Sequence, residues 1–199
     1  MDGLLTSGPH EANRVEPWPG LARLVARIRV AAPRLGPVRL VAVDGPAGSG
    51  KSTLAATLAD SLIAAGEDVR VLHLDDLYEG WAGLDGVWDR LEGVLIPLSR
   101  GEVGRFRRYD WHTRDWAEWN LVPPPGVLVV EGCGAAARAV DDRAVARIWV
   151  EAPQSERQLR GLARDGEAMR AEWLAWMRAE AAHFEREGTR SRADYRFST

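Results

Sequence analysis

The 199-residue chain is 46% hydrophobic and 28% charged, proportions that are typical of a globular protein and unlike those of an intrinsically disordered one. Its formal net charge of −3, without a block of Lys and Arg, argues against a nucleic acid partner. The chain has one cysteine, no recognisable secretion signal and no apolar run of the roughly 20 residues that span a bilayer, so we expect a cytoplasmic protein without a membrane partner.

The first predicted elements are a helix and a buried strand. Residues 1–20 are rich in Pro, Gly and polar residues and predict an irregular lead-in to a single domain at residues 21–199. Apolar residues at helical spacing follow from Leu21 until Pro33, which ends the helix. The nearly continuous apolar run at residues 38–43 then predicts a strand covered on both faces, as in a parallel sheet.

Further apolar segments alternate with stretches long enough for crossover connections. A helix after the first strand ends near Gly66, and further strands are predicted at residues 69–74, 127–130, 146–150 and 193–197. Residues 155–187 have helical periodicity. This order predicts a three-layer α/β fold, in which helices cover both faces of a doubly wound, mostly parallel sheet of five strands.

The loop after the first strand carries the most specific motif of the chain. Residues 45–52 read Gly-Pro-Ala-Gly-Ser-Gly-Lys-Ser, the Walker A pattern of P-loop NTPases, between a predicted strand and a predicted helix. Such a loop surrounds a phosphate with backbone N–H groups, its Lys reaches the β and γ oxygens, and its Ser binds Mg²⁺. The alternative is a glycine-rich turn that only links the two elements. The residues predicted to bind ATP are Gly45, Pro46, Ala47, Gly48, Ser49, Gly50, Lys51, Ser52 and Thr53.

Acidic residues end two of the other predicted strands. Ligands of open parallel sheets bind at the carboxyl ends of the strands, where Asp75 and Asp76 follow one strand and Glu131 follows another. Asp75 could accept the proton of a substrate hydroxyl or help to hold Mg²⁺, and Glu131 stands where a Walker B acid is found. All three could instead be ordinary turn or capping residues. We predict Asp75 as the general base and Ser52, Asp75 and Glu131 as the metal-binding residues.

Three arginines lie on one face of the predicted helix after residue 154. Arg157, Arg160 and Arg164 stand at i, i+3 and i+7, so their guanidinium groups could together clamp phosphoryl oxygens. The alternative is a solvated helix surface, balanced by Glu156 and Asp165.

These motifs resemble those of the uridine kinase-like branch of P-loop nucleoside kinases. Residues 74–78, Leu-Asp-Asp-Leu-Tyr, are similar to the family's Asp-x-Phe-Tyr segment, residues 109–114 to its Tyr-Asp-Phe segment and residues 129–132 to its Phe-Glu-Gly segment. The resemblance implies that Asp75 is the catalytic base and that residues 155–170 form a lid over the phosphates. With Asp75, the predicted catalytic residues are Lys51, Arg160 and Arg164. The residues predicted to bind the acceptor are Asp76, Tyr78, Tyr109, Asp110, Trp111 and Arg114.

The sequence therefore predicts a kinase that uses ATP and Mg²⁺ to phosphorylate a hydroxyl of a small molecule, by resemblance a nucleoside such as uridine or cytidine. Two alternatives remain open, a kinase for another hydroxylated metabolite and a regulatory ATPase that has no acceptor. A GTPase is disfavoured because the chain lacks an Asn-Lys-x-Asp segment. The sequence leaves open the identity of the acceptor and whether the chain forms a homo-oligomer.

Overall fold

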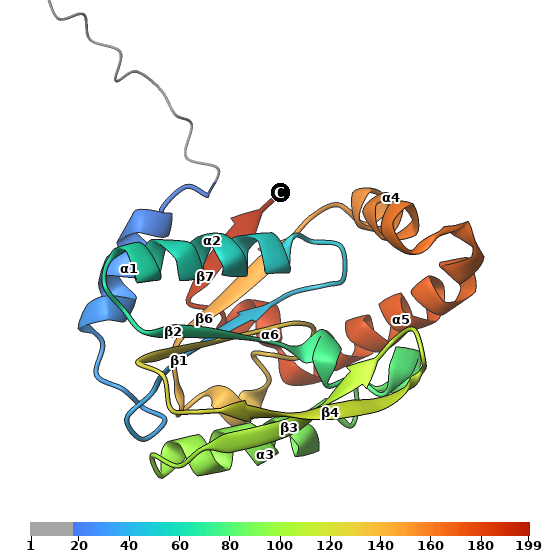
Figure 1. Cartoon of the computed structure of the whole chain (residues 1–199). Helices are drawn as coiled ribbons and strands as arrows, with labels where there is room; N and C mark the ends of the chain where they lie inside the picture. The colour runs from blue at the N-terminus through green and yellow to red at the C-terminus, as the bar shows by residue number, and fades with distance from the viewer. Residues whose placement is uncertain (1–17) are drawn as a thin grey trace, which may run out of the picture.

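The computed structural model describes residues 18–199, and its centre is a parallel sheet of five strands (Figure 1). Most of the predicted lead-in lies outside the described residues. In spatial order the strands are β2 (Val69–His73), β5 (Val127–Glu131), β1 (Arg39–Asp44), β6 (Ala144–Glu151) and β7 (Tyr195–Ser198). All four neighbouring pairs are parallel. The predicted fold class is confirmed. Because these strands are parallel, the carboxyl ends of β2, β5 and β1 lie next to one another at the same edge of the sheet.

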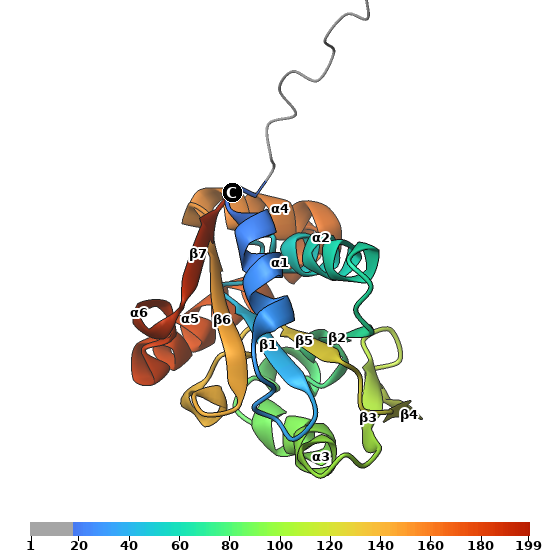
Figure 2. The same cartoon turned by 90° about the vertical axis from the view of Figure 1, so that its left-hand side faces the viewer.

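Helices cover both faces of this sheet (Figure 2). On one face, α1 (Leu21–Val30) and α2 (Lys51–Ala64) pack on Val41 and Val43 of β1. On the other face, α3 (Val87–Ser99) packs with Leu40 and Ala42 of the same strand. Alternate residues of one strand thus belong to two different cores, which explains the nearly continuous apolar run in the sequence.

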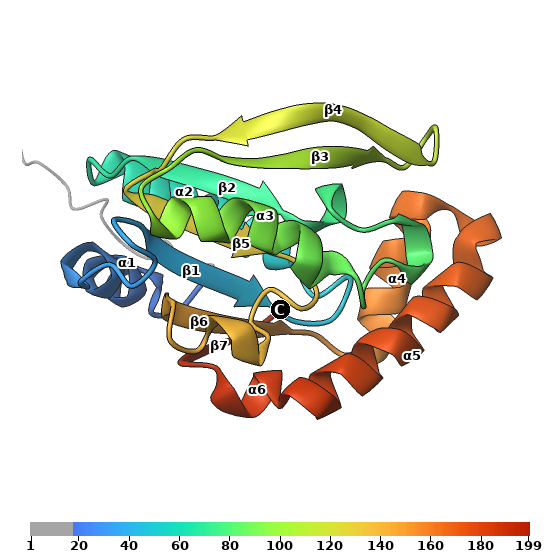
Figure 3. The same ribbon diagram turned by 90° about the horizontal axis from the view of Figure 1, so that it is seen from below.

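An antiparallel hairpin is inserted between α3 and β5. It consists of β3 (Gly104–Asp110) and β4 (Asp115–Val122) and packs on α3, at the β2 side of the sheet (Figure 3). We predicted no strands here, because polar and aromatic residues interrupt the apolar alternation. The hairpin carries four of the residues predicted to bind the acceptor, namely Tyr109, Asp110, Trp111 and Arg114, and β3 packs beside residues 74–76 at the end of β2.

The C-terminal helical segment is divided where the sequence showed one continuous periodicity. The helix α4 (Gln154–Asp165) ends at Gly166, whose φ of 94° lies in the left-handed region. A 3₁₀ turn (Glu167–Met169) then leads into α5 (Arg170–Glu187), and α6 (Thr189–Arg192) precedes β7. The turn separates α4 from α5 at one end of the molecule (Figure 3). Within residues 18–199, no helix has the length and apolar character needed to span a membrane.

Candidate active site

The loop between β1 and α2 is shaped to receive an anion. Gly45, Gly48 and Gly50 have φ angles of 145°, 77° and 91°, which residues with a side chain rarely adopt. At Gly48 a Cβ atom would lie 2.5 Å from the carbonyl oxygen of Arg157 on α4, so only glycine fits. α2 begins directly after this loop, at Lys51, and its N-terminus adds a partial positive charge.

Lys51 is held inside the loop. Its Nζ donates a hydrogen bond of 3.1 Å to the Pro46 carbonyl and lies 3.7 Å from Cys133 Sγ. Burial alone would lower the pKa of Lys51, but interactions with Cys133 and with the Glu131 and Glu180 carboxylates raise it above its ordinary value of 10.5. Lys51 therefore supplies a permanent positive charge to the loop.

Glu131 connects the phosphate-binding loop with β2. The sheet register pairs Val43 at the end of β1 with Glu131 at the end of β5. Glu131 Oε1 accepts a hydrogen bond of 3.1 Å from Ser52 Oγ and lies 2.6 Å from His73 Nδ1. This contact with Glu131 is the main cause that raises the pKa of His73. The structure thus brings together Ser52 and Glu131, two of the three side chains that the sequence predicted to bind magnesium.

Asp75 lies in the short 3₁₀ turn that follows β2, Leu74–Asp76. Its side chain is exposed to the interior of the cavity described below, and its carbonyl oxygen accepts a hydrogen bond of 2.8 Å from the Trp111 indole. The protein atoms that surround this carboxylate and the negative charge of Glu131 raise the pKa of Asp75 above 3.8. A carboxylate with a raised pKa is a better proton acceptor than an ordinary one.

A cavity of about 780 Å³ joins these groups. It extends from the phosphate-binding loop past Asp75 to the hairpin and α5, which is room for a nucleotide tail and a second small molecule. Most of the predicted site residues line it, namely Ala47, Gly48, Gly50, Lys51, Ser52, Thr53, Asp75, Tyr78, Tyr109, Trp111, Arg114, Glu131, Arg160 and Arg164.

Five predicted site residues do not line this cavity. Gly45, Pro46 and Ser49 are largely enclosed within the loop itself. Asp110 instead stabilises the turn of the hairpin, because its Oδ1 accepts hydrogen bonds from the backbone N–H groups of residues 112 and 113. Asp76 lies beside Asp75 but outside the cavity wall. Asp76 and Asp110, which the sequence predicted to bind an acceptor, are thus not among the residues that line the cavity.

The three arginines of α4 do not act as one group. Arg160 and Arg164 line the cavity, and Arg160 donates a hydrogen bond of 3.3 Å to the Gly48 carbonyl. Arg164 forms two hydrogen bonds with Asp165, of 2.7 and 2.9 Å. Arg157 is buried, does not line the cavity, and contacts Glu180 and the Ala47 carbonyl. Of the three arginines, only Arg160 and Arg164 can reach a molecule in the cavity, because Arg157 is committed to its ion pair with Glu180.

Aromatic side chains form the wall opposite the loop. Trp81 stands at its centre and meets Trp111, Trp173 and Trp176 in edge-to-face contacts, with centroids 5.6, 6.0 and 6.2 Å apart. These rings come from three separate segments, the turn after β2, the hairpin and α5. The helical spacing of Trp173 and Trp176 is consistent with their burial, but it does not show that both residues line a cavity. Tertiary packing alone reveals that part of the site.

Two polar atoms near this wall have no hydrogen-bond partner in the part of the chain that the structure describes. They are Trp176 Nε1, a donor, and Glu172 Oε2, an acceptor, and both residues line the cavity. A buried polar group without a partner costs about 1–3 kcal/mol. Both atoms are themselves buried, so they are covered by neighbouring side chains rather than open to the cavity.

Asp44, which sequence reasoning did not select, anchors the start of the loop. It is fully buried at the end of β1, and its carboxylate accepts hydrogen bonds of 2.7, 2.9 and 2.8 Å from the N–H groups of Gly45, Gly134 and Ala136. Burial raises the pKa of Asp44 to about 6, although these three hydrogen bonds oppose the shift. Its position could have identified it in the sequence, because it is an acidic residue at the end of an apolar strand, directly before the Walker A glycine.

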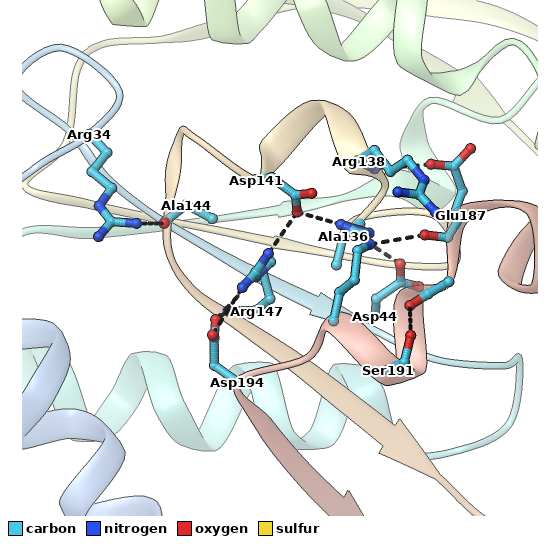
Figure 4. A network of polar contacts seen from close by, with 12 residues as sticks. Arg34, Asp44, Ala136, Arg138, Asp141, Ala144, Arg147, Glu187, Ser191 and Asp194 are labelled. Atoms are coloured by element: carbon cyan, nitrogen blue, oxygen red, sulfur yellow. Dashed lines mark hydrogen bonds and ion pairs between the residues drawn. The ribbon is translucent and has the colours of Figure 1, made fainter.

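A chain of polar contacts extends from Asp44 to the C-terminal segment (Figure 4). The carbonyl oxygen of Ala136 accepts a hydrogen bond from Arg192 on α6, which also pairs with Asp141. Asp141 in turn pairs with Arg147 of β6. The loop after β5, which carries the hydrogen-bond donors for Asp44, is thereby tied to the far side of the sheet.

The comparisons with known proteins agree with this architecture. No family model and no curated protein sequence matches the chain. A solved structure described as a "Possible Uridine Kinase" from Bacillus stearothermophilus is similar at 21% identity, with a TM-score of 0.63 over 89% of this chain and 97% of that one. A "putative fructose transport system kinase" from Silicibacter sp. TM1040 is similar at 23% identity, with a TM-score of 0.70 over 89% and 98%. At these identities the likeness establishes that the chain has the fold of P-loop small-molecule kinases.

Proposed function

We propose that this protein is a kinase that transfers the γ-phosphoryl group of ATP to a hydroxyl of a small molecule with a flat ring, such as a nucleoside. The observation that carries the proposal is that one continuous cavity contains all of these groups. The phosphate-binding loop lies at one end, an aromatic wall lies at the other, and Asp75 lies in the lining between them. A protein that only binds or hydrolyses the nucleotide would not need the aromatic end of the cavity.

In the proposed reaction the residues of the chain act mainly by position and charge. Backbone N–H groups of the loop and Lys51 hold the β and γ phosphates. Asp75 accepts the proton of the acceptor hydroxyl. At the same time the hydroxyl oxygen forms a bond to the γ phosphorus, and the bond from that phosphorus to the leaving ADP breaks. Arg160 and Arg164 neutralise the charge of the moving phosphoryl group, as positioned arginines do in such reactions.

The residues also fit a magnesium ion of the kind that P-loop enzymes use. Mg²⁺ retains several waters and takes only one or two protein ligands beside the phosphates of its substrate. Ser52 and Glu131, whose oxygens lie 3.1 Å apart, and the nearby Asp75 would hold it. Within residues 18–199, no group of three or more His, Cys, Asp or Glu residues is arranged to hold a metal ion. When bound, the ion would neutralise charge on the β and γ oxygens.

The acceptor wall favours a flat or ring-shaped molecule. Aromatic faces and edges pack well on planar rings and on the apolar faces of sugars. A sugar is the second candidate, because one similar structure is described as a kinase of a fructose transport system.

The proposal is tested by a panel of nucleosides and sugars with ATP and magnesium, in which ADP formation and the phosphorylated product are both measured. We expect one class of compound to give stoichiometric product. If sugars react and nucleosides do not, the nucleoside is replaced by a sugar and the kinase remains. If ADP formation is the same with every acceptor and no product forms, the protein is an ATPase without an acceptor.

A second test uses the fact that Lys51 is the only lysine of the chain. An amine-reactive acylating reagent should modify Lys51 more slowly when ATP and magnesium are present, because the phosphates then cover Nζ. Mass spectrometry of the tryptic peptides measures this, and the α-amino group of Met1 serves as the internal reference. Equal modification of Lys51 with and without ATP would contradict nucleotide binding at this loop.

A further inference from the structure

Ala47, the third residue of the phosphate-binding loop, has both of its backbone polar groups bound by side chains from outside the loop. Its N–H donates a hydrogen bond of 2.8 Å to Glu180 Oε2 on α5. Its carbonyl oxygen accepts a hydrogen bond of 3.1 Å from Arg157 Nη1 on α4. The loop is therefore held at this residue by hydrogen bonds from side chains of α4 and α5, which lie more than 100 positions further along the chain.

The two side chains that hold Ala47 also bind each other. Arg157 Nη1 and Glu180 Oε1 are 2.9 Å apart, and Arg157 and Glu180 are only 9% and 2% exposed. A buried ion pair adds little net stability compared with apolar side chains of the same size. This pair is therefore poorly explained as a device that only holds the fold together.

The position of the pair relates it to the reaction. Arg157 lies one helical turn before Arg160 and two turns before Arg164, the two arginines of α4 that line the cavity. On its other side, Glu180 Oε2 lies 3.5 Å from Cys133 Sγ, which in turn contacts Lys51 Nζ at 3.7 Å. The pair thus stands between the base of α4 and the lysine of the loop.

Resting on the function proposed above, we propose that Glu180 is a positioning residue for phosphoryl transfer, which fixes Ala47 through its N–H group and α4 through Arg157. The Glu180 carboxylate then fixes the position of the phosphate-binding loop relative to the arginines of α4. Because the Ala47 N–H is committed to Glu180, phosphate binding falls to the amides later in the loop. The backbone of α4 stays close to Gly48, where only glycine fits.

The test compares Glu180→Ala and Glu180→Gln with the control Glu185→Gln, an exposed residue of the same helix. Titration calorimetry gives the Kd for ATP with magnesium, steady-state kinetics with the identified acceptor gives kcat and KM, and thermal unfolding shows whether each variant is folded. For Glu180→Ala we expect at least about a tenfold higher Kd for ATP and at least about a tenfold lower kcat. Glutamine keeps an oxygen for the Ala47 N–H but lacks the charge that holds Arg157, so it should recover most of the ATP affinity while kcat remains low.

A variant that is only less stable, with a lower Tm, would not combine a nearly normal Kd for ATP with a low kcat. The inference is overturned if folded Glu180→Gln and wild type have equal kcat and Kd, or if Glu185→Gln is impaired as much as the Glu180 variants. If Glu180→Ala does not fold, the glutamine variant decides. If the wild-type protein itself binds no ATP, the proposed function fails. If the wild-type protein binds ATP and Glu180→Gln has the same Kd and kcat, only the role of Glu180 is refuted.

Discussion

Replacing Asp44 with Asn should change how the stability of the protein depends on pH. Asp44 is fully buried, and burial raises the pKa of its carboxyl to about 6 from the ordinary value of 3.8. Between these values the folded protein binds the proton more tightly than the unfolded chain does. Stability contributed by this group is therefore highest below about pH 4, falls as the pH rises, and reaches its minimum above about pH 6.

The size of the effect follows from the two pKa values. One pKa unit corresponds to about 1.4 kcal/mol, so the whole shift of Asp44 amounts to about 3 kcal/mol, of which about 2.5 kcal/mol falls between pH 4 and pH 7. Asparagine does not titrate and removes this contribution, whatever its effect on stability at a single pH. The free energy of unfolding of wild type, measured relative to that of Asp44→Asn, should fall by about this amount over the interval.

Urea unfolding followed by circular dichroism, at half-unit steps from pH 4 to pH 7.5, measures this difference. Asp142→Asn, at an exposed position before β6, controls for the removal of one carboxylate. If the stability curves of wild type and Asp44→Asn run parallel, the carboxyl does not titrate in this range. The account of Asp44 as a buried anchor that becomes charged near pH 6 would then be refuted.

Three further changes probe the site. Gly161→Ala should lower the free energy of unfolding by about 1–3 kcal/mol in urea titrations, because its Cβ would lie 2.1 Å from the Trp173 ring, and an unchanged value would show that the two helices are not packed as described. Asp75→Asn should leave the Kd for ATP unchanged but lower kcat by about 10²–10⁴-fold, and equal turnover would remove Asp75 as the base. Trp176→Phe leaves a smaller ring in the aromatic wall, so the KM of the acceptor should rise by up to about tenfold with little change in the KM of ATP, and an unchanged acceptor KM would mean that this ring does not contact the acceptor.

The sequence predicted the fold because its strongest signals are local. The alternation of Leu40, Val41, Ala42 and Val43 between two cores makes a strand without polar interruption. The glycines after it mark the loop directly. The hairpin was missed because its strands carry Arg, Trp and Asp residues, and its inner face is recognisable only once α3 is in place beneath it.

The parts of the site that the sequence did not reveal depend on contacts between distant segments. Arg157 shares helical spacing with Arg160, but Glu180 on another helix draws it into the interior. The periodicity of Trp173 and Trp176 predicts burial, and burial alone does not distinguish a core from the wall of a cavity. Residues that follow a strand end, such as Asp75 and Glu131, could be selected because parallel strands bring their carboxyl ends together.

Titration calorimetry of wild type and Lys51→Ala with ATP and magnesium tests the central claim most directly. Arg23→Ala, an exposed change on α1, serves as the control for the loss of one positive charge. We predict one molecule of ATP bound per chain in wild type and in Arg23→Ala, with binding lost or weakened by at least about a hundredfold in Lys51→Ala. No association with wild type, or equal affinity in Lys51→Ala, would contradict the proposal that this loop binds the phosphates of the nucleotide.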